Sequence, residues 1–218
     1  HNPRDFHRIC AAYAAHGNPL YVAEHSSSLG SRSERNVYYA LGEHGAIGFD
    51  PWAIDAAHPD RFGPPPVDPV GGEWSAEARR IRDSYYAIGR AMAPIVDAQG
   101  GDRLYTFVQE FDESGTAWET PDGDVFLAYR EPERAARGFA IRLAPREFLF
   151  VGQGIEITFR RPRPDGRAVP VERIEWGRYE GNEWRAIHPI RRQHLESWGQ
   201  PIRLIEPGVV RVWLASSA

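Results

Sequence analysis

The stretch NPLYVAE at residues 18–24 indicates an α/β fold for the first part of this chain. Residues 18–23 predict a short apolar strand, and Glu24 follows it directly before the polar loop HSSS at residues 25–28. An α/β barrel keeps its catalytic groups at the C-terminal ends of such strands. Glu24 is therefore our candidate catalytic residue, and a solvated loop carboxylate or a helix N-cap partner is the simpler alternative.

Helix and strand signals alternate around this stretch. Residues 5–16 and 33–44 predict helices that end before Gly17 and Gly45, and residues 46–49 predict a second short strand. Helix, strand, helix and strand with short connections are typical of a parallel α/β sheet. An intact barrel needs about 250 residues, so only its last two β/α units would fit here.

A proline-rich loop at residues 56–72 separates this segment from a predicted long helix at residues 75–99. The helix carries an apolar stripe at helical spacing, and Pro94 should kink its last turns. The stripe consists of Ile81, Tyr85, Ile88, Met92, Ile95 and Val96. It is too continuous for a solvated linker, so we expect it to pack against the following domain and fix it in place.

From residue 103 onward the apolar pattern has period two, with turn signals such as DG at residues 122–123 and GN at residues 181–182. Eight or nine short strands without an intervening helix predict an antiparallel β-sandwich. The predicted fold class is thus α/β followed by all-β. Its domains are a barrel piece with the proline-rich loop at 1–72, a linking helix at 73–101 and a sandwich at 102–218.

Composition excludes several classes of protein. The net charge of -4 and the pI near 6.1 argue against a nucleic-acid or anionic-membrane partner. Cys10 is the sole cysteine, the His and Cys residues lack zinc spacing, and no P-loop or dinucleotide fingerprint occurs. We therefore expect no metal and no cofactor. The apolar runs are too short to span a bilayer, and a chain that starts with His1 is expected to be the C-terminal piece of a longer protein.

Several segments resemble a known family. HGNPLYVAE at residues 16–24 and RNVYYALGEHGAIGF at residues 35–49 are similar to the end of the catalytic barrel of bacterial family 35 glycoside hydrolases. These are mostly β-galactosidases, and they are retaining enzymes. The β-rich remainder resembles the C-terminal sandwich of unknown function in one subgroup of that family. The segments that carry this second resemblance are FAI at 139–141, EFLFVGQG at 147–154 and EWGRY at 175–179.

The resemblance implies that Glu24 is the nucleophile of a two-carboxylate mechanism acting on a β-galactoside. The partner acid/base would come from barrel strand four, which lies upstream of this chain, so the fragment alone should be inactive. Tyr21, Phe49 and Trp52 are candidates for stacking on the sugar. Core packing is the simpler expectation for Tyr21, and stacking is favoured slightly for Trp52. His25 is a candidate for binding a sugar hydroxyl, with a plain loop role as an equal alternative.

Two other functions stay open from the sequence. The sandwich could be a carbohydrate-binding module without catalysis, or a structural domain that supports the barrel. Large aromatic side chains serve cores first, so we expect most of the sandwich aromatics to serve core or inter-domain packing. The aromatics that could bind a glycan are Trp118, Trp176, Tyr179, Trp184, Trp198 and Trp213.

Overall fold

The computed structural model describes residues 3–26, 32–52, 76–130, 136–162, 166–191 and 201–216. The chain forms two units, His1–Tyr86 and Ala87–Ala218. The proline-rich loop predicted at 56–72 lies outside the described residues. The domain limits expected from the sequence, at residues 72 and 101, remain a prediction.

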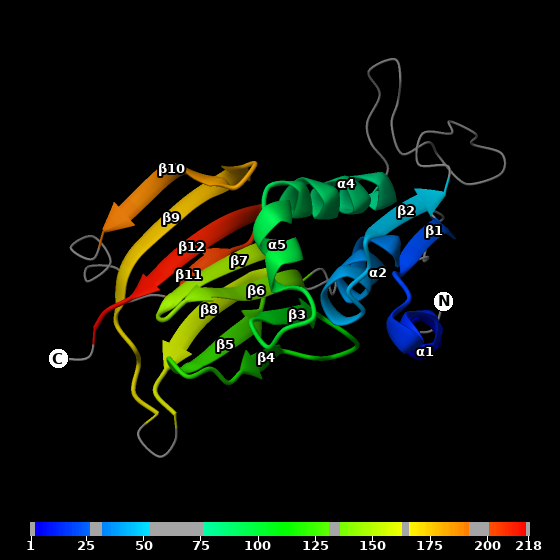
Figure 1. Cartoon of the computed structure of the whole chain (residues 1–218). Coiled ribbons are helices and arrows are strands. Elements are labelled where there is room, and N and C mark those ends of the chain that lie inside the picture. The colour runs from blue at the N-terminus through cyan, green and yellow to red at the C-terminus, as the bar shows by residue number, and fades with distance from the viewer. Residues whose placement is uncertain are drawn as a thin grey trace. The chain divides into compact units, whose positions relative to one another are not determined.

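The first unit contains helices and two strands. In chain order these are α1 (Pro3–Ala14), η1 (Ala15–Gly17), β1 (Tyr21–Ser26), α2 (Ser33–Tyr38), η2 (Tyr39–Glu43) and β2 (Gly48–Trp52) (Figure 1). β1 and β2 pair in parallel, from Tyr21 opposite Gly48 to Ser26 opposite Trp52. A parallel pair needs a crossover connection, which α2 and η2 supply. The order of elements agrees with the sequence, whereas their membership of a barrel stays a prediction.

The single helix predicted at residues 75–99 is two helices in the structure, α4 (Ala76–Gly89) and α5 (Met92–Ala98). The break follows from Pro94, whose ring clashes with a helical carbonyl four residues earlier, at Arg90. The Arg90 carbonyl accepts a hydrogen bond from the backbone N–H of Tyr179 at 2.7 Å instead. Neither of these helices nor any other described helix is long and apolar enough to cross a membrane.

The break also divides the predicted apolar stripe. Ile81, Ile88 and Ile95 are buried, with at most 3% of each side chain exposed, whereas Met92 and Val96 are 43% and 57% exposed. Because the helix restarts at Met92, the apolar spacing no longer follows one face through both helices. α5 packs against β6 of the sandwich, and Ile95 is the one stripe residue of α5 that is buried. The prediction of a continuous packed stripe is therefore wrong for Met92 and Val96.

The second unit is a β-sandwich of two antiparallel sheets. One sheet has the strand order β10-β9-β12-β7-β6-β3, and the other has the order β11-β8-β5-β4 (Figure 1). The described strands are β3 (Leu104–Val108), β4 (Gly115–Trp118), β5 (Asp124–Tyr129), β6 (Arg137–Ala144), β7 (Glu147–Gln153), β8 (Ile155–Arg160), β9 (Val171–Glu180), β10 (Glu183–Arg191), β11 (Ile202–Leu204) and β12 (Gly208–Leu214).

The predicted alternation of apolar residues forms the core between these sheets. β8 contributes Ile155, Ile157 and Phe159, which face residues of the other sheet such as Phe148 and Val212. All five are buried. The β-rich fold is thus confirmed, with ten strands among the described residues where eight or nine were expected. The additional strand, β4, is four residues long and starts with a glycine, so its sequence carries little strand signal.

The six-stranded sheet is buried on both faces in its middle. Along β6 and β7, the side chains that alternate with the core residues point to the other face and are also fully buried. They are Phe139, Ile141, Leu149 and Val151. A strand buried on both faces has a continuous apolar run, as in FAI and FLFV. The contact of α5 with β6 supplies cover on this outer face.

The division of the stripe leads to a test in α4 and α5. Ile88→Asp places a charge at a buried position and should lower the free energy of unfolding by about 3 kcal/mol or more. Met92→Asp is the matched control, because the exposed Met92 should tolerate the charge within about 0.5 kcal/mol. Urea titrations followed by far-UV circular dichroism measure both losses. Equal losses would contradict the burial difference between the two positions.

Candidate functional site

The C-terminal half of β1 contains a bulge at the candidate catalytic residue. Val22 lies opposite Phe49 and His25 opposite Pro51, so Ala23 and Glu24 together face the one residue between them, Asp50. A bulge turns the side chains of its strand, and bulges are common at barrel rims and beside active sites. The backbone of Glu24 is part of β1, whereas its side chain lies outside the described structure.

His25 is held in place by α2. The Nδ2 of Asn36 lies 2.9 Å from Nε2 of His25, and the Oγ of Ser33 lies 2.7 Å from Nδ1. The amide Nδ2 can only donate, so Nε2 accepts, and Nδ1 carries the proton that is donated to Ser33. The ring also packs against Phe6 and Phe49, at centroid distances of 5.6 and 5.1 Å. A sugar hydroxyl would have to displace one of these bonds, so the geometry favours a positioning role for His25.

The three candidate stacking residues differ in exposure. Phe49 is 8% exposed and packs against Phe6 and His25, so its ring belongs to the core. Tyr21 is 55% exposed and lies beside Gly48, where a Cβ would be 2.4 Å from its Cε2. Trp52 ends β2 opposite Ser26, and its side chain lies outside the described residues. The simpler expectation for Tyr21, core packing, does not describe its exposed ring.

Tyr85 and Ser84 anchor α4 within the same unit. The Tyr85 hydroxyl donates to the backbone carbonyl of Phe49 at 2.7 Å, and the Ser84 hydroxyl donates to that of Glu34 at 2.8 Å. Burial, followed by the charge of Asp50, raises the pKa of Tyr85, so its hydroxyl stays protonated. The sequence suggested only an apolar contact for Tyr85, because helical spacing does not reveal a hydrogen bond to a strand carbonyl.

A cluster of His7, Glu43 and His44 lies elsewhere in the first unit. The Nδ1 of His7 is 3.1 Å from Nε2 of His44 and 3.4 Å from Oε2 of Glu43. Burial lowers the pKa of His44 and the charge of His7 lowers it further, whereas burial raises the pKa of Glu43 against an opposing effect of His7. The sequence did not indicate this cluster, since His7 is far from the other two residues along the chain.

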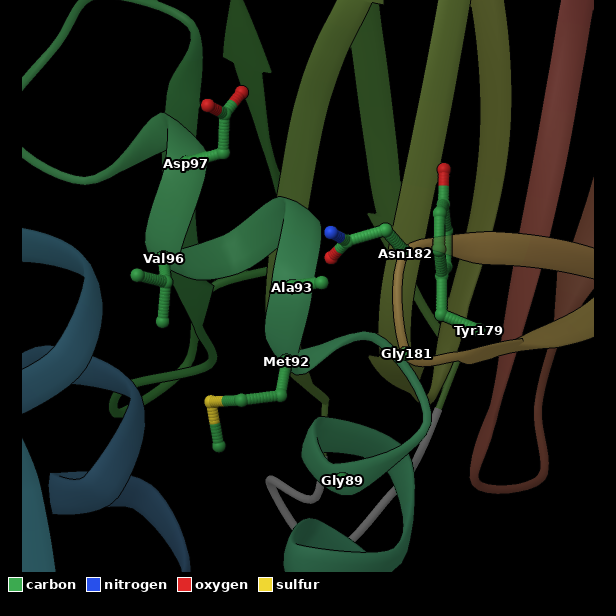
Figure 2. A pocket seen from close by; sticks show the side chains of 8 residues that line it. All are labelled: Gly89, Met92, Ala93, Val96, Asp97, Tyr179, Gly181 and Asn182. Atoms are coloured by element: carbon green, nitrogen blue, oxygen red, sulfur yellow. The ribbon is translucent and has the colours of Figure 1, made fainter.

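The sandwich unit has an open groove of about 560 Å³ between α5 and the turn that joins β9 to β10. In Figure 2 the Asn182 side chain projects from this turn toward Ala93, and the Tyr179 ring rises beside it. The groove combines exposed apolar side chains with an amide, a phenol and a carboxylate. It is lined by Gly89, Met92, Ala93, Val96, Asp97, Tyr179, Gly181 and Asn182.

An aromatic and charged cluster continues from Tyr179 over the outer face of β9 and β10. The Tyr179 and Trp184 rings are 5.3 Å apart, and Trp184 donates from Nε1 to Glu175 at 2.8 Å. The Trp184 ring covers Gly177, where a Cβ would lie 2.6 Å from ring carbon Cζ2. Burial raises the pKa of Tyr179, with Arg211 opposing and Glu147 adding to this effect.

The sandwich aromatics thus fall into two groups. Trp118 and Trp176 are partly buried and pack against the core, so the core packing expected for most of these aromatics is seen for two of the five that the structure describes. Tyr179, Trp184 and Trp213 belong to the outer face, where guanidinium groups of Arg173 and Arg211 lie 4.4 and 4.9 Å from the Trp213 ring. Trp198 lies outside the described residues.

Comparison with known proteins shows a family for this chain. A family model described as "Domain of unknown function (DUF5597)" matches residues 81–189, which is half of the chain. The match runs from α4 to β10 and includes the residues that line the groove. Comparison with curated proteins finds no match.

The contacts of His25 predict the protonation of its ring. At neutral pH the proton should be on Nδ1, because Asn36 donates to Nε2. Two-dimensional ¹⁵N NMR of the imidazole nitrogens measures the tautomer. Asn36→Ala should cost about 1–3 kcal/mol of stability, since it removes a buried hydrogen-bond partner. Asn18→Ala is the control, because Asn18 is exposed and bonds only locally to Ala15. An Nε2–H tautomer would contradict the assignment.

Proposed function

We propose that this chain, which belongs to the family described as Domain of unknown function (DUF5597), is the C-terminal part of a retaining glycoside hydrolase of β-galactosidase type. Glu24 is the nucleophile in this proposal, and its partner acid/base lies upstream of His1. The sandwich serves as a fixed support next to the barrel.

The observation that carries this proposal is the bulge at Ala23 and Glu24 in a parallel β-α-β unit. Catalytic carboxylates of α/β barrels occupy the C-terminal ends of parallel strands, and Glu24 lies in the C-terminal half of β1, two residues before the strand ends at Ser26. β-Bulges are frequent at barrel rims and beside active sites, which supports a functional interpretation of this position. His25, the residue that follows Glu24, is held in place by its hydrogen bonds with Ser33 and Asn36.

Exposed apolar side chains support a larger parent structure. Four large apolar or aromatic side chains of the first unit are about half exposed or more. They are Ile9 (48%) and Tyr13 (68%) of α1, Tyr21 (55%) of β1 and Ile47 (70%) before β2. Parallel sheets are normally covered on both faces and have more than two strands. In the proposal, neighbouring units of the barrel cover part of this surface, and Tyr21 is available to stack on a substrate.

The chemistry assigned to Glu24 requires an ionised carboxylate about 5–5.5 Å from a protonated one. Glu24 attacks the anomeric carbon while the partner protonates the leaving oxygen, which gives a covalent galactosyl ester. The partner then removes a proton from water, and the water releases Glu24 with retained configuration. In this scheme Phe49 and His25 hold the bulge, whereas Tyr21 and Trp52 contact the sugar.

A second candidate function is glycan binding by the sandwich itself. The groove beside Tyr179 favours it, because its volume of about 560 Å³ lies in the usual range of ligand sites, roughly 300–1,000 Å³. The lining offers apolar surface from Met92 and Val96 and polar groups from Asn182 and Asp97. The Arg103 guanidinium already pairs with Asp97 at 3.1 Å, so a ligand would compete with this ion pair at Asp97 but not at Asn182.

Turnover by the complete parent protein tests the nucleophile. Glu24→Gln should lower kcat on an aryl β-galactoside by several orders of magnitude, because the covalent step is lost. Azide should restore part of this turnover and give a product of inverted configuration. Glu183→Gln, at an exposed position of β10, is the control and should leave kcat unchanged. Near-normal turnover of Glu24→Gln would exclude Glu24 from the mechanism. Robust turnover by the 218-residue chain alone would contradict the proposal that the partner acid/base lies outside this chain.

Calorimetric titration of the chain with galacto-oligosaccharides tests the second candidate. If the groove binds glycans, Tyr179→Ala should weaken binding about two- to tenfold, since an aromatic contact is worth about 0.5–1.5 kcal/mol. Tyr13→Ala, which truncates an exposed tyrosine of the first unit, should leave binding unchanged. No measurable binding by the wild type would exclude the module function and favour a purely supporting sandwich.

A further inference from the structure

We propose that His7, Glu43 and His44 form a binding site for a divalent metal ion, with Zn²⁺ as the ion that fits best. The ion would fasten α1, which carries His7, to the segment that joins η2 to β2. This inference is independent of the role proposed for Glu24, because it uses none of the same residues.

The distances within the cluster match those of a zinc ligand set. Zinc binds His nitrogen at about 2.0–2.1 Å in a tetrahedral arrangement, so two of its ligand atoms lie about 3.3 Å apart. The Nδ1 of His7 is 3.1 Å from Nε2 of His44 and 3.4 Å from Oε2 of Glu43. The three ligand atoms all lie within 4.8 Å of one another. One ion could therefore contact all three with small side-chain adjustments.

The local backbone explains how neighbouring residues can share one ion. In a regular α-helix consecutive side chains point about 100° apart, which would separate Glu43 from His44. Here η2 widens into a π-turn, with the His44 N–H donating to the Tyr39 carbonyl at 3.3 Å. His44 itself leaves the helix at φ -111° and ψ 2°. π-Turns occur often at functional sites because they redirect side chains in this way.

Packing fixes the third ligand. The His7 ring meets the Tyr39 ring edge-on at a centroid distance of 4.3 Å, so its Nδ1 is held toward His44 and Glu43. Two imidazoles and one carboxylate are a donor set that zinc uses in proteins, with a fourth position for water. The side chains of His7 and Glu43 are 29% and 42% exposed, so an ion and its water can enter from solvent.

Direct metal titration of the metal-stripped 218-residue chain tests the site. Isothermal calorimetry with ZnCl₂ should give one ion per chain, and His7→Ala, His44→Ala and Glu43→Gln should each weaken binding about tenfold or more. This bound is conservative, since removal of a residue that merely supports a ligand typically costs about 10–100-fold. His188→Ala is the matched control, because His188 is an exposed histidine of β10.

Cobalt spectroscopy and thermal unfolding separate loss of the site from loss of the fold. Co²⁺ in the wild type should give the intense visible bands of a four-coordinate ion, and the variants should lose them. Zinc should raise the Tm of the wild type through binding to the native state and should not raise that of His44→Ala. Metal-free circular dichroism should be the same for all variants.

Three outcomes would overturn the proposal. The first is no stoichiometric zinc binding by the wild type in large molar excess of the metal, which would leave a hydrogen-bonded His and Glu cluster. The second is binding that any of the three variants leaves unchanged. The third is loss of binding in His188→Ala, which would place the ion elsewhere.

Discussion

The break between α4 and α5 is the constraint on which the arrangement of the sandwich unit depends. Pro94 prevents a continuous helix, and the Arg90 carbonyl bonds to Tyr179 of β9 instead. This bond ties the start of α5 to the same edge of the sheet that forms the groove. It also directs Ile95 inward and leaves Met92 and Val96 exposed. The segment that follows this break thus contributes both to the cover of β6 and to the lining of the groove.

In the first unit a comparable role belongs to the hydrogen bonds of His25. Its two ring nitrogens join the end of β1 to the start of α2, and its ring packs between Phe6 and Phe49. The strand end that contains Glu24 is therefore supported by a buried polar contact on one side and by aromatic packing on the other. Such support is what a catalytic carboxylate needs, because small displacements of a reacting group are costly.

The two units satisfy their charged groups in different ways. On the outer face of the sandwich, Glu175 is almost fully buried, and it accepts hydrogen bonds from Arg173 at 2.8 Å and from Trp184 at 2.8 Å. Burial of this carboxylate is tolerable because it is paired and hydrogen-bonded. The His7 cluster is more open, and its three groups converge on one point. This difference is why we assign a structural role to the first network and a ligand to the second.

The sequence by itself determined the β-sandwich, because period-two alternation in segments such as residues 155–159 decides which side chains can face a core. It also determined the order of helices and strands before residue 52. The structure extends β1 to Ser26, so Glu24 lies inside this strand and not after it as the sequence predicted. Only the tertiary structure decided that Phe49 is buried while Tyr21 is exposed, and that His7 meets Glu43 and His44. It also showed a bulge at Glu24. These features depend on contacts between segments far apart in the chain, and local periodicity carries no information about such contacts.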